Sequence, residues 1–181
     1  MMALPMPPTA GFAPRRADLR FLFEHPAHLI ALGFGSGLSP VAAGTAGSLW
    51  AWAVFLLLRP WIDDAQWGIV LLLSFGVGWW ACTRAAQALR QSDPSAIVWD
   101  EVLAMWIVLW LVMPTGWQGQ LAAFLLFRLF DVVKVGPVAW ADDLFKARAG
   151  ETIGAKQGLG IVLDDLVAAL CALVVIAVWR L

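Results

Sequence analysis

The sequence predicts an all-α, polytopic membrane protein with about four to five short spans and a glycine-rich loop on the cytoplasmic side. Of its 181 residues, 61% are hydrophobic and only 14% are charged, whereas soluble domains carry about 45–50% apolar and about 25% charged residues. A chain this short cannot bury so much apolar surface in its own core, so lipid must cover the remainder. The net charge of −1 argues against nucleic acid as a partner, because nucleic-acid binders present a strongly basic face.

The amino-terminal third predicts a tail, an interfacial segment and a first span. Residues 1–24 begin Pro-rich and lack the apolar core of a signal peptide, so we expect a mobile cytoplasmic tail that leads into an interfacial segment. An amphipathic segment is expected over residues 18–32. The uncharged run 29–58 is interrupted by glycines and a proline, which indicates a glycine-rich loop followed by a span at about 47–58. Residues 25–181 form the expected membrane domain.

Four further apolar segments follow the first span. Several are shorter than the ~20 apolar residues that a full crossing needs, so charged flanks must extend the helices or some segments must tilt. This leaves the number of crossings at four or five. The polar stretch 141–156 is expected to be a cytoplasmic loop. The four segments are residues 66–82, 102–113, 119–127 and 166–179.

The distribution of basic residues predicts the orientation. With the amino terminus inside, ten of the twelve basic residues fall on the cytoplasmic side and only Arg59 and Arg180 fall outside. Such an excess of Lys and Arg is typical of cytoplasmic segments. The ten are Arg15, Arg16, Arg20, Arg84, Arg90, Arg128, Lys134, Lys146, Arg148 and Lys156.

Five carboxylates at the edges of apolar segments are the candidate catalytic and metal-binding residues. Any one of them is more simply explained as a helix cap or half of an ion pair, but five on one face repel one another unless a cation joins them. The group contains no histidine or cysteine, and oxygen ligands favour a hard cation, Mg²⁺ before Ca²⁺ or Mn²⁺. The five are Asp100, Glu101, Asp131, Asp164 and Asp165.

Basic and hydroxyl side chains beside these acids are candidate phosphate ligands. Arg128, Asp131 and Lys134 recur every three residues and form one stripe along a helix end. Alone, this stripe predicts a surface ion-pair ladder; beside a metal cluster, it offers a guanidinium and an ammonium group to a phosphate. The glycine-rich stretch adds hydroxyls and a following helix start, which is a common anion site. The candidate substrate-binding hydroxyls are Ser36, Thr45 and Ser48.

Five segments in order carry a family resemblance: FGSGLSP, GTAGSL, IVWDE, FRLFDVVK and GLGIVLDD. Over about residues 25–170 the chain resembles the phosphatidylglycerophosphatase A family. The resemblance implies a Mg²⁺-dependent lipid phosphatase of the cell inner membrane, which converts phosphatidylglycerophosphate to phosphatidylglycerol at the cytoplasmic face during phospholipid biosynthesis. It implies that the five carboxylates form the acidic site and that Arg128 and Lys134 are its basic partners. The chain departs from the family pattern at Ala43, at Ala104 and within residues 134–137.

Two other functions fit parts of the sequence. A transporter or ion-coupled channel subunit would also use intramembrane acids, but its coupling site is expected near mid-depth rather than at one face. A histidine-based lipid phosphatase needs a histidine in the site, and His25 and His28 both lie upstream of every cluster. The phosphatase with an acidic, metal-dependent site is therefore the prediction.

Overall fold

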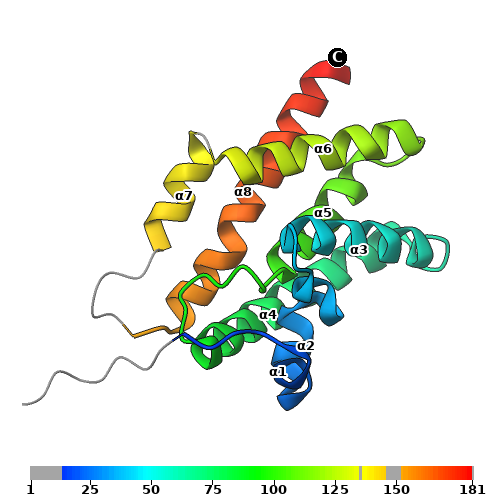
Figure 1. Cartoon of the computed structure of the whole chain (residues 1–181). Helices are drawn as coiled ribbons and strands as arrows, with labels where there is room; N and C mark the ends of the chain where they lie inside the picture. Colours follow the sequence, from blue (N-terminus) through cyan, green and yellow to red (C-terminus); the bar gives the residue numbers. More distant parts are fainter. Residues whose placement is uncertain (1–13, 135, 146–151, 181) are drawn as a thin grey trace, which may run out of the picture.

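The computed structural model describes residues 14–134, 136–145 and 152–180, and every regular element among them is a helix (Figure 1). The all-α prediction is confirmed for these residues. The elements, in chain order, are α1 (Leu19–Glu24), α2 (Pro26–Ala31), the 3₁₀ helix η1 (Gly33–Leu38), α3 (Ala43–Leu58), α4 (Asp64–Leu89), α5 (Trp99–Val112), α6 (Trp117–Val133), α7 (Pro137–Phe145) and α8 (Ala155–Arg180).

The amphipathic segment expected over residues 18–32 is two short helices rather than one. The Asp18 side chain caps α1 by accepting from the Phe21 N–H at 2.7 Å. His25 has extended backbone angles, because the residue before a proline is disfavoured in the helical region, and its ring caps α2. Pro26 then opens α2, where its missing N–H costs nothing.

The glycine-rich loop is shorter than predicted, because α3 begins at Ala43 and not near residue 47. Gly44, Gly47 and Ser48 therefore lie in the first turns of a helix. The glycines here serve close packing rather than loop flexibility: a Cβ at Gly47 would lie 2.8 Å from the Val98 Cβ. Before α3, the chain turns at Ala42, whose φ of 49° is left-handed.

Helices α4 and α8 are the long elements, with 26 residues each, and both extend beyond the predicted spans 66–82 and 166–179. Among the described residues these two helices are long and apolar enough to cross a membrane. Helices α3, α5 and α6 have 16, 14 and 17 residues, fewer than the ~20 of an independent crossing. The loop expected at 141–156 begins inside α7, and residues 146–151 lie outside the described ranges.

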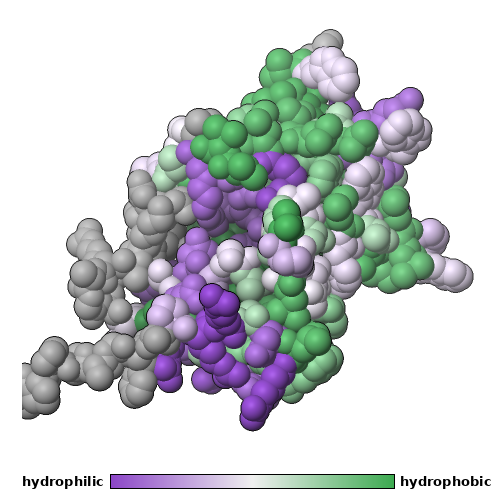
Figure 2. Space-filling model, in the orientation of Figure 1, coloured by the Kyte–Doolittle hydropathy of each residue, from purple (hydrophilic) through white to green (hydrophobic). Residues whose placement is uncertain are grey.

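Helix α5 is the centre of the bundle and packs against α3, α4, α6 and α8. Ten of its 14 residues are buried, among them Leu103, Met105 and Leu109. Large apolar side chains of the outer helices are instead exposed, such as Leu72 of α4 and Val174 of α8. Figure 2 shows hydrophobic surface over α6 and, below it, a hydrophilic area. Exposed apolar helices around a buried central one are the pattern expected of a membrane bundle.

Two glycines let long helices approach their neighbours closely. A Cβ at Gly78 of α4 would overlap the Trp99 indole at the start of α5, and a Cβ at Gly158 of α8 would lie 2.8 Å from the Thr83 Cα. The Trp99 Nε1 also donates to the Ser74 carbonyl at 3.1 Å. Small residues at such crossings bring backbones together, which membrane helices use for association. Gly78 thus lets the first residue of α5 pack directly against α4.

We expect Gly78→Ala to lower the free energy of unfolding by about 1–3 kcal/mol, because the added methyl must displace the Trp99 ring. Gly76→Ala is the matched control on the same helix, since a Cβ at Gly76 meets nothing within 4 Å. That control should gain up to about 1 kcal/mol from helix propensity. Thermal unfolding of both variants in detergent micelles makes the comparison, and equal melting temperatures would contradict the packing role.

Candidate active site

A cavity of about 200 Å³ lies where five parts of the chain meet. These parts are the start of α3, the loop between α4 and α5, the start of α5, the carboxyl end of α6 and the amino-terminal half of α8. All seven charged residues that the sequence singled out line this cavity: Asp100, Glu101, Arg128, Asp131, Lys134, Asp164 and Asp165. Folding therefore brings together side chains from three helices, which the sequence could only group by type.

Helix α5 supplies Asp100 and Glu101 from its first turn. Carboxylates are favoured there, because the free N–H groups at a helix start carry partial positive charge. Val98, the residue directly before α5, donates its N–H to the Ala31 carbonyl at 2.9 Å, which connects the start of α5 to α2. Asp100 is only 8% exposed, so its charge is largely removed from water.

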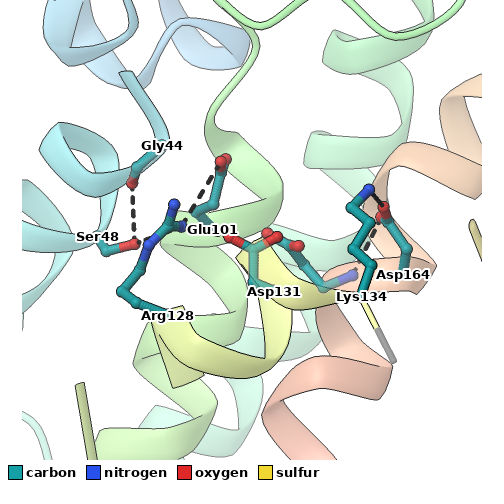
Figure 3. A network of polar contacts seen from close by, with 8 residues as sticks. Gly44, Ser48, Glu101, Arg128, Asp131, Lys134 and Asp164 are labelled. Atoms are coloured by element: carbon teal, nitrogen blue, oxygen red, sulfur yellow. Dashed lines mark hydrogen bonds and ion pairs between the residues drawn. The ribbon is translucent and has the colours of Figure 1, made fainter. Parts of the chain in front are cut away.

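Arg128 of α6 connects three helices (Figure 3). Its Nη1 lies 2.7 Å from Asp131 Oδ2, 3.8 Å from Glu101 Oε1 and 3.4 Å from Ser48 Oγ. Ser48 in turn donates its hydroxyl to the Gly44 carbonyl at 2.9 Å. A Cβ at Gly44 would overlap Glu101 Oε1, so only glycine leaves room for this carboxylate beside α3.

Lys134 makes a further ion pair in the cavity. Its Nζ lies 2.9 Å from Asp164 Oδ2 and links the end of α6 to α8. Lys134 is the C-cap of α6, with a left-handed φ of 45°. Asp164 and Asp165 were predicted just before the last span, but they lie inside α8, because that helix already begins at Ala155.

Three carboxylates, Asp100, Glu101 and Asp165, can hold a metal ion. Each offers one oxygen, and these oxygens lie within 4.8 Å of one another. Each of the three also has one buried oxygen without a hydrogen-bond partner among the described residues. Buried carboxylate oxygens without partners are costly, and a bound cation would satisfy them. The donors are all oxygen, so the residues fit a hard divalent cation.

The charges of the cavity therefore divide into two groups. Asp131 and Asp164 are paired with Arg128 and Lys134. Within the described ranges, the closest ion pair of the three-carboxylate group is the 3.8 Å contact of Glu101 with Arg128. The Arg128 Nε is buried and has no partner among the described residues. A buried donor without a partner is costly, and an anionic oxygen bound beside it would satisfy it.

None of the three predicted hydroxyl residues, Ser36, Thr45 and Ser48, is among the residues that line this cavity. Ser36 is in η1 and donates to the Gly33 carbonyl at 2.8 Å. Thr45 is in the first turn of α3. Of the three predicted hydroxyls, only Ser48 joins the charged network, through Arg128.

Sequence reasoning missed Asp93, which also lines the cavity. It is exposed and belongs to the loop between α4 and α5. A signal was present, because Asp93 lies in the same polar segment as Asp100 and Glu101. Its distance from any apolar helix made it resemble an ordinary loop residue.

Comparison with known proteins shows the family of the chain. The family model described as Phosphatidylglycerophosphatase A matches residues 29–180. Phosphatidylglycerophosphatase A of Escherichia coli (strain K12) is 36% identical over 160 residues, covering 86% of each chain. The protein of that name from Haemophilus influenzae is 36% identical over 152 residues, covering 84% of this chain and 87% of its own length.

A third relative carries a different name. It is a Bacteroides thetaiotaomicron protein named as a candidate phosphatidylinositol-3-phosphatase, 37% identical over 163 residues, covering 84% of this chain and 92% of its own length. No solved structure shows significant similarity to the chain. The family match and the two namesake relatives extend over most of the sequence, and the family match spans the positions of all seven charged cavity residues. The chain belongs to the phosphatidylglycerophosphatase A family.

Proposed function

We propose that the chain hydrolyses the terminal phosphate monoester of phosphatidylglycerophosphate, releasing phosphatidylglycerol and inorganic phosphate. One observation carries the proposal: three clustered carboxylates, each with a buried oxygen that has no hydrogen-bond partner among the described residues, line the same cavity as Arg128, whose buried Nε also has none. A metal site beside a guanidinium donor is the arrangement that phosphoryl transfer requires. Family membership supports this lipid as the substrate, while the third relative's name indicates a different lipid phosphate for that protein.

The metal in this proposal is Mg²⁺, held by Asp100, Glu101 and Asp165. When bound, it supplies Lewis acidity toward a phosphate oxygen. The oxygen-only donor set supports a hard cation. Removing the three carboxylates from water without a cation would leave like charges close together, so binding of the cation also stabilises this end of the bundle.

Arg128 binds and orients the phosphate in this proposal. Asp131 and Glu101 hold one side of its guanidinium, which leaves Nε to donate to a phosphate oxygen. Ser48 acts through Arg128 rather than on the substrate, because its hydroxyl lies between Arg128 and the Gly44 carbonyl. Lys134, a third exposed at its side chain, adds positive charge at the edge of the cavity.

The membrane arrangement belongs to the same proposal. Residues 25–181 form one membrane domain in which α3, α4, α5, α6 and α8 cross the inner membrane, with the cavity toward the cytoplasm. The cavity gathers the start of α3, the loop that leads from α4 to α5, the start of α5 and the end of α6, which supports alternating crossings. Helix α5 packs against α3, α4, α6 and α8. Because these helices surround it, its length need not match the thickness of the lipid.

Membrane vesicles test activity, metal and orientation together. Inverted vesicles containing the chain should release phosphate from added short-chain phosphatidylglycerophosphate, EDTA should abolish release, and Mg²⁺ should restore it. Sealed right-side-out vesicles should release phosphate only after permeabilisation. No release from any preparation would contradict the function, full activity in metal-free buffer would contradict the metal, and equal activity in both vesicle types would contradict the orientation.

Two adjacent aspartates separate the metal site from the ion pairs. Asp165→Asn should lower turnover at least about a hundredfold, yet leave the metal-free protein as stable as the wild type or more so, because one repelling charge is removed. Asp164→Asn instead removes the ion pair with Lys134, so it should lower the free energy of unfolding by about 1–3 kcal/mol.

Thermal unfolding with and without Mg²⁺, and turnover on the same preparations, make this comparison. Mg²⁺ should raise the melting temperature of the wild type but not of Asp165→Asn. An Asp165→Asn protein that is unstable without metal but active per folded molecule would show that the residue is a structural charge.

Arg128→Ala should lower turnover by about a hundred- to a thousandfold, the usual effect of losing a donor to the developing charge. Arg128→Lys should also be impaired, because an ammonium group cannot replace the planar guanidinium. Arg84→Ala, on the exposed surface of α4, is the control and should retain near-normal turnover. A near-normal Arg128→Ala enzyme would remove this residue from the proposed mechanism.

A further inference from the structure

A larger cavity of about 610 Å³ adjoins the acidic one. The two share Ala43 and Ser95 as lining residues, so one begins where the other ends. The larger cavity is bordered by residues 14–17, by the turn between η1 and α3, and by the loop between α4 and α5. None of the roles assigned to the acidic cavity uses these residues.

The amino-terminal wall of this cavity is held in place by hydrogen bonds. Residues 14–17 run beside the carboxyl end of α4 (Figure 1), where the Arg15 N–H donates to the Leu89 carbonyl at 3.0 Å. Gln91 Nε2 donates to the Arg15 carbonyl at 3.1 Å. The Arg15 guanidinium also donates a hydrogen bond to each carboxylate oxygen of Glu24, at 2.8 and 2.6 Å. These hydrogen bonds hold residues 14–17 in a defined position beside the cavity.

The charge of this cavity is opposite to that of its neighbour. Arg15 and Arg16 line it, and no carboxylate is among its described lining residues. The hydrogen bonds from Arg15 lower the pKa of Glu24, so this carboxylate stays ionised and balances Arg15. Arg16 is exposed and forms no ion pair within the described part of the chain. The guanidinium of Arg16 is therefore available to an anion.

We propose that this second cavity binds the phosphodiester of the lipid substrate, with Arg16 as its cationic ligand. The inference rests on the proposed function. Phosphatidylglycerophosphate carries two phosphates joined by a glycerol, a terminal monoester and an internal diester. With the monoester in the acidic cavity, the diester lies one glycerol unit away, in the adjoining basic cavity. Arg16 then favours lipids that carry this second phosphate over those with a monoester alone.

Inhibition by two probes tests this assignment. Dihexanoyl phosphatidylglycerol retains the phosphodiester but lacks the monoester, whereas inorganic phosphate resembles the monoester. In Arg16→Ala, the inhibition constant of dihexanoyl phosphatidylglycerol and the KM for short-chain phosphatidylglycerophosphate should both rise about tenfold, as for the loss of one charge-assisted hydrogen bond. The inhibition constant of inorganic phosphate and kcat should stay unchanged.

Arg20→Ala is the matched control, because it removes one exposed arginine of the same segment that does not line the cavity. It should change none of these constants. An unchanged inhibition constant in Arg16→Ala, an equal rise in Arg20→Ala, or inhibition by dihexanoyl phosphatidylglycerol that is not competitive with substrate would each overturn the assignment.

Direct titration of dihexanoyl phosphatidylglycerol separates this inference from the proposed function. If dihexanoyl phosphatidylglycerol binds about tenfold more weakly to Arg16→Ala than to the wild type, but the wild type releases no phosphate, the subsite is upheld and the phosphatase is refuted. Phosphate release by a protein whose binding of dihexanoyl phosphatidylglycerol is independent of Arg16 would do the reverse.

Discussion

Arg128 joins three helices at the end of the bundle where negative charge is concentrated. Its guanidinium contacts Glu101 of α5 and Asp131 of α6 and reaches Ser48 of α3. Like charges from separate helices repel one another in a medium that screens them poorly. Without a cation among them, the start of α5 and the end of α6 would be driven apart. The ion pair of Lys134 with Asp164 extends the same balance to α8.

Close helix packing is the condition under which these charges can meet. Gly44 leaves room for Glu101, and Gly78 leaves room for the Trp99 indole directly before Asp100. Larger residues at either position would shift the first turn of α5, from which two of the three candidate metal ligands project. The glycines of this chain thus connect the fold to the site, because they determine how near the carboxylates come to Arg128 and to one another.

The two adjoining cavities offer opposite charge to one substrate. The acidic cavity suits a cation that engages the reacting phosphate, and the basic cavity suits a phosphate that does not react. Binding energy from a non-reacting part of a substrate can position the reacting part. The N-terminal segment, expected from the sequence to be a mobile tail that leads into an interfacial segment by residue 24, lines this second cavity through residues 14–17. Arg15 hydrogen-bonds to Leu89 of α4 and to Gln91.

The sequence by itself determined that the chain is helical and apolar enough to need lipid, and it identified the seven charged residues of the cavity. The apolar character follows directly from the composition and the apolar runs. The charged residues stand out because unpaired charge in an apolar segment is costly. Tertiary structure decided what each residue does. The sequence pattern could not reveal that α3 starts at Ala43 or that α8 already begins at Ala155. Considered only with their neighbours, glycines indicate a loop and charged residues indicate the end of a helix. Nor could it distinguish paired Asp164 from its neighbour Asp165 in the three-carboxylate group, since pairing depends on which side of α8 faces Lys134.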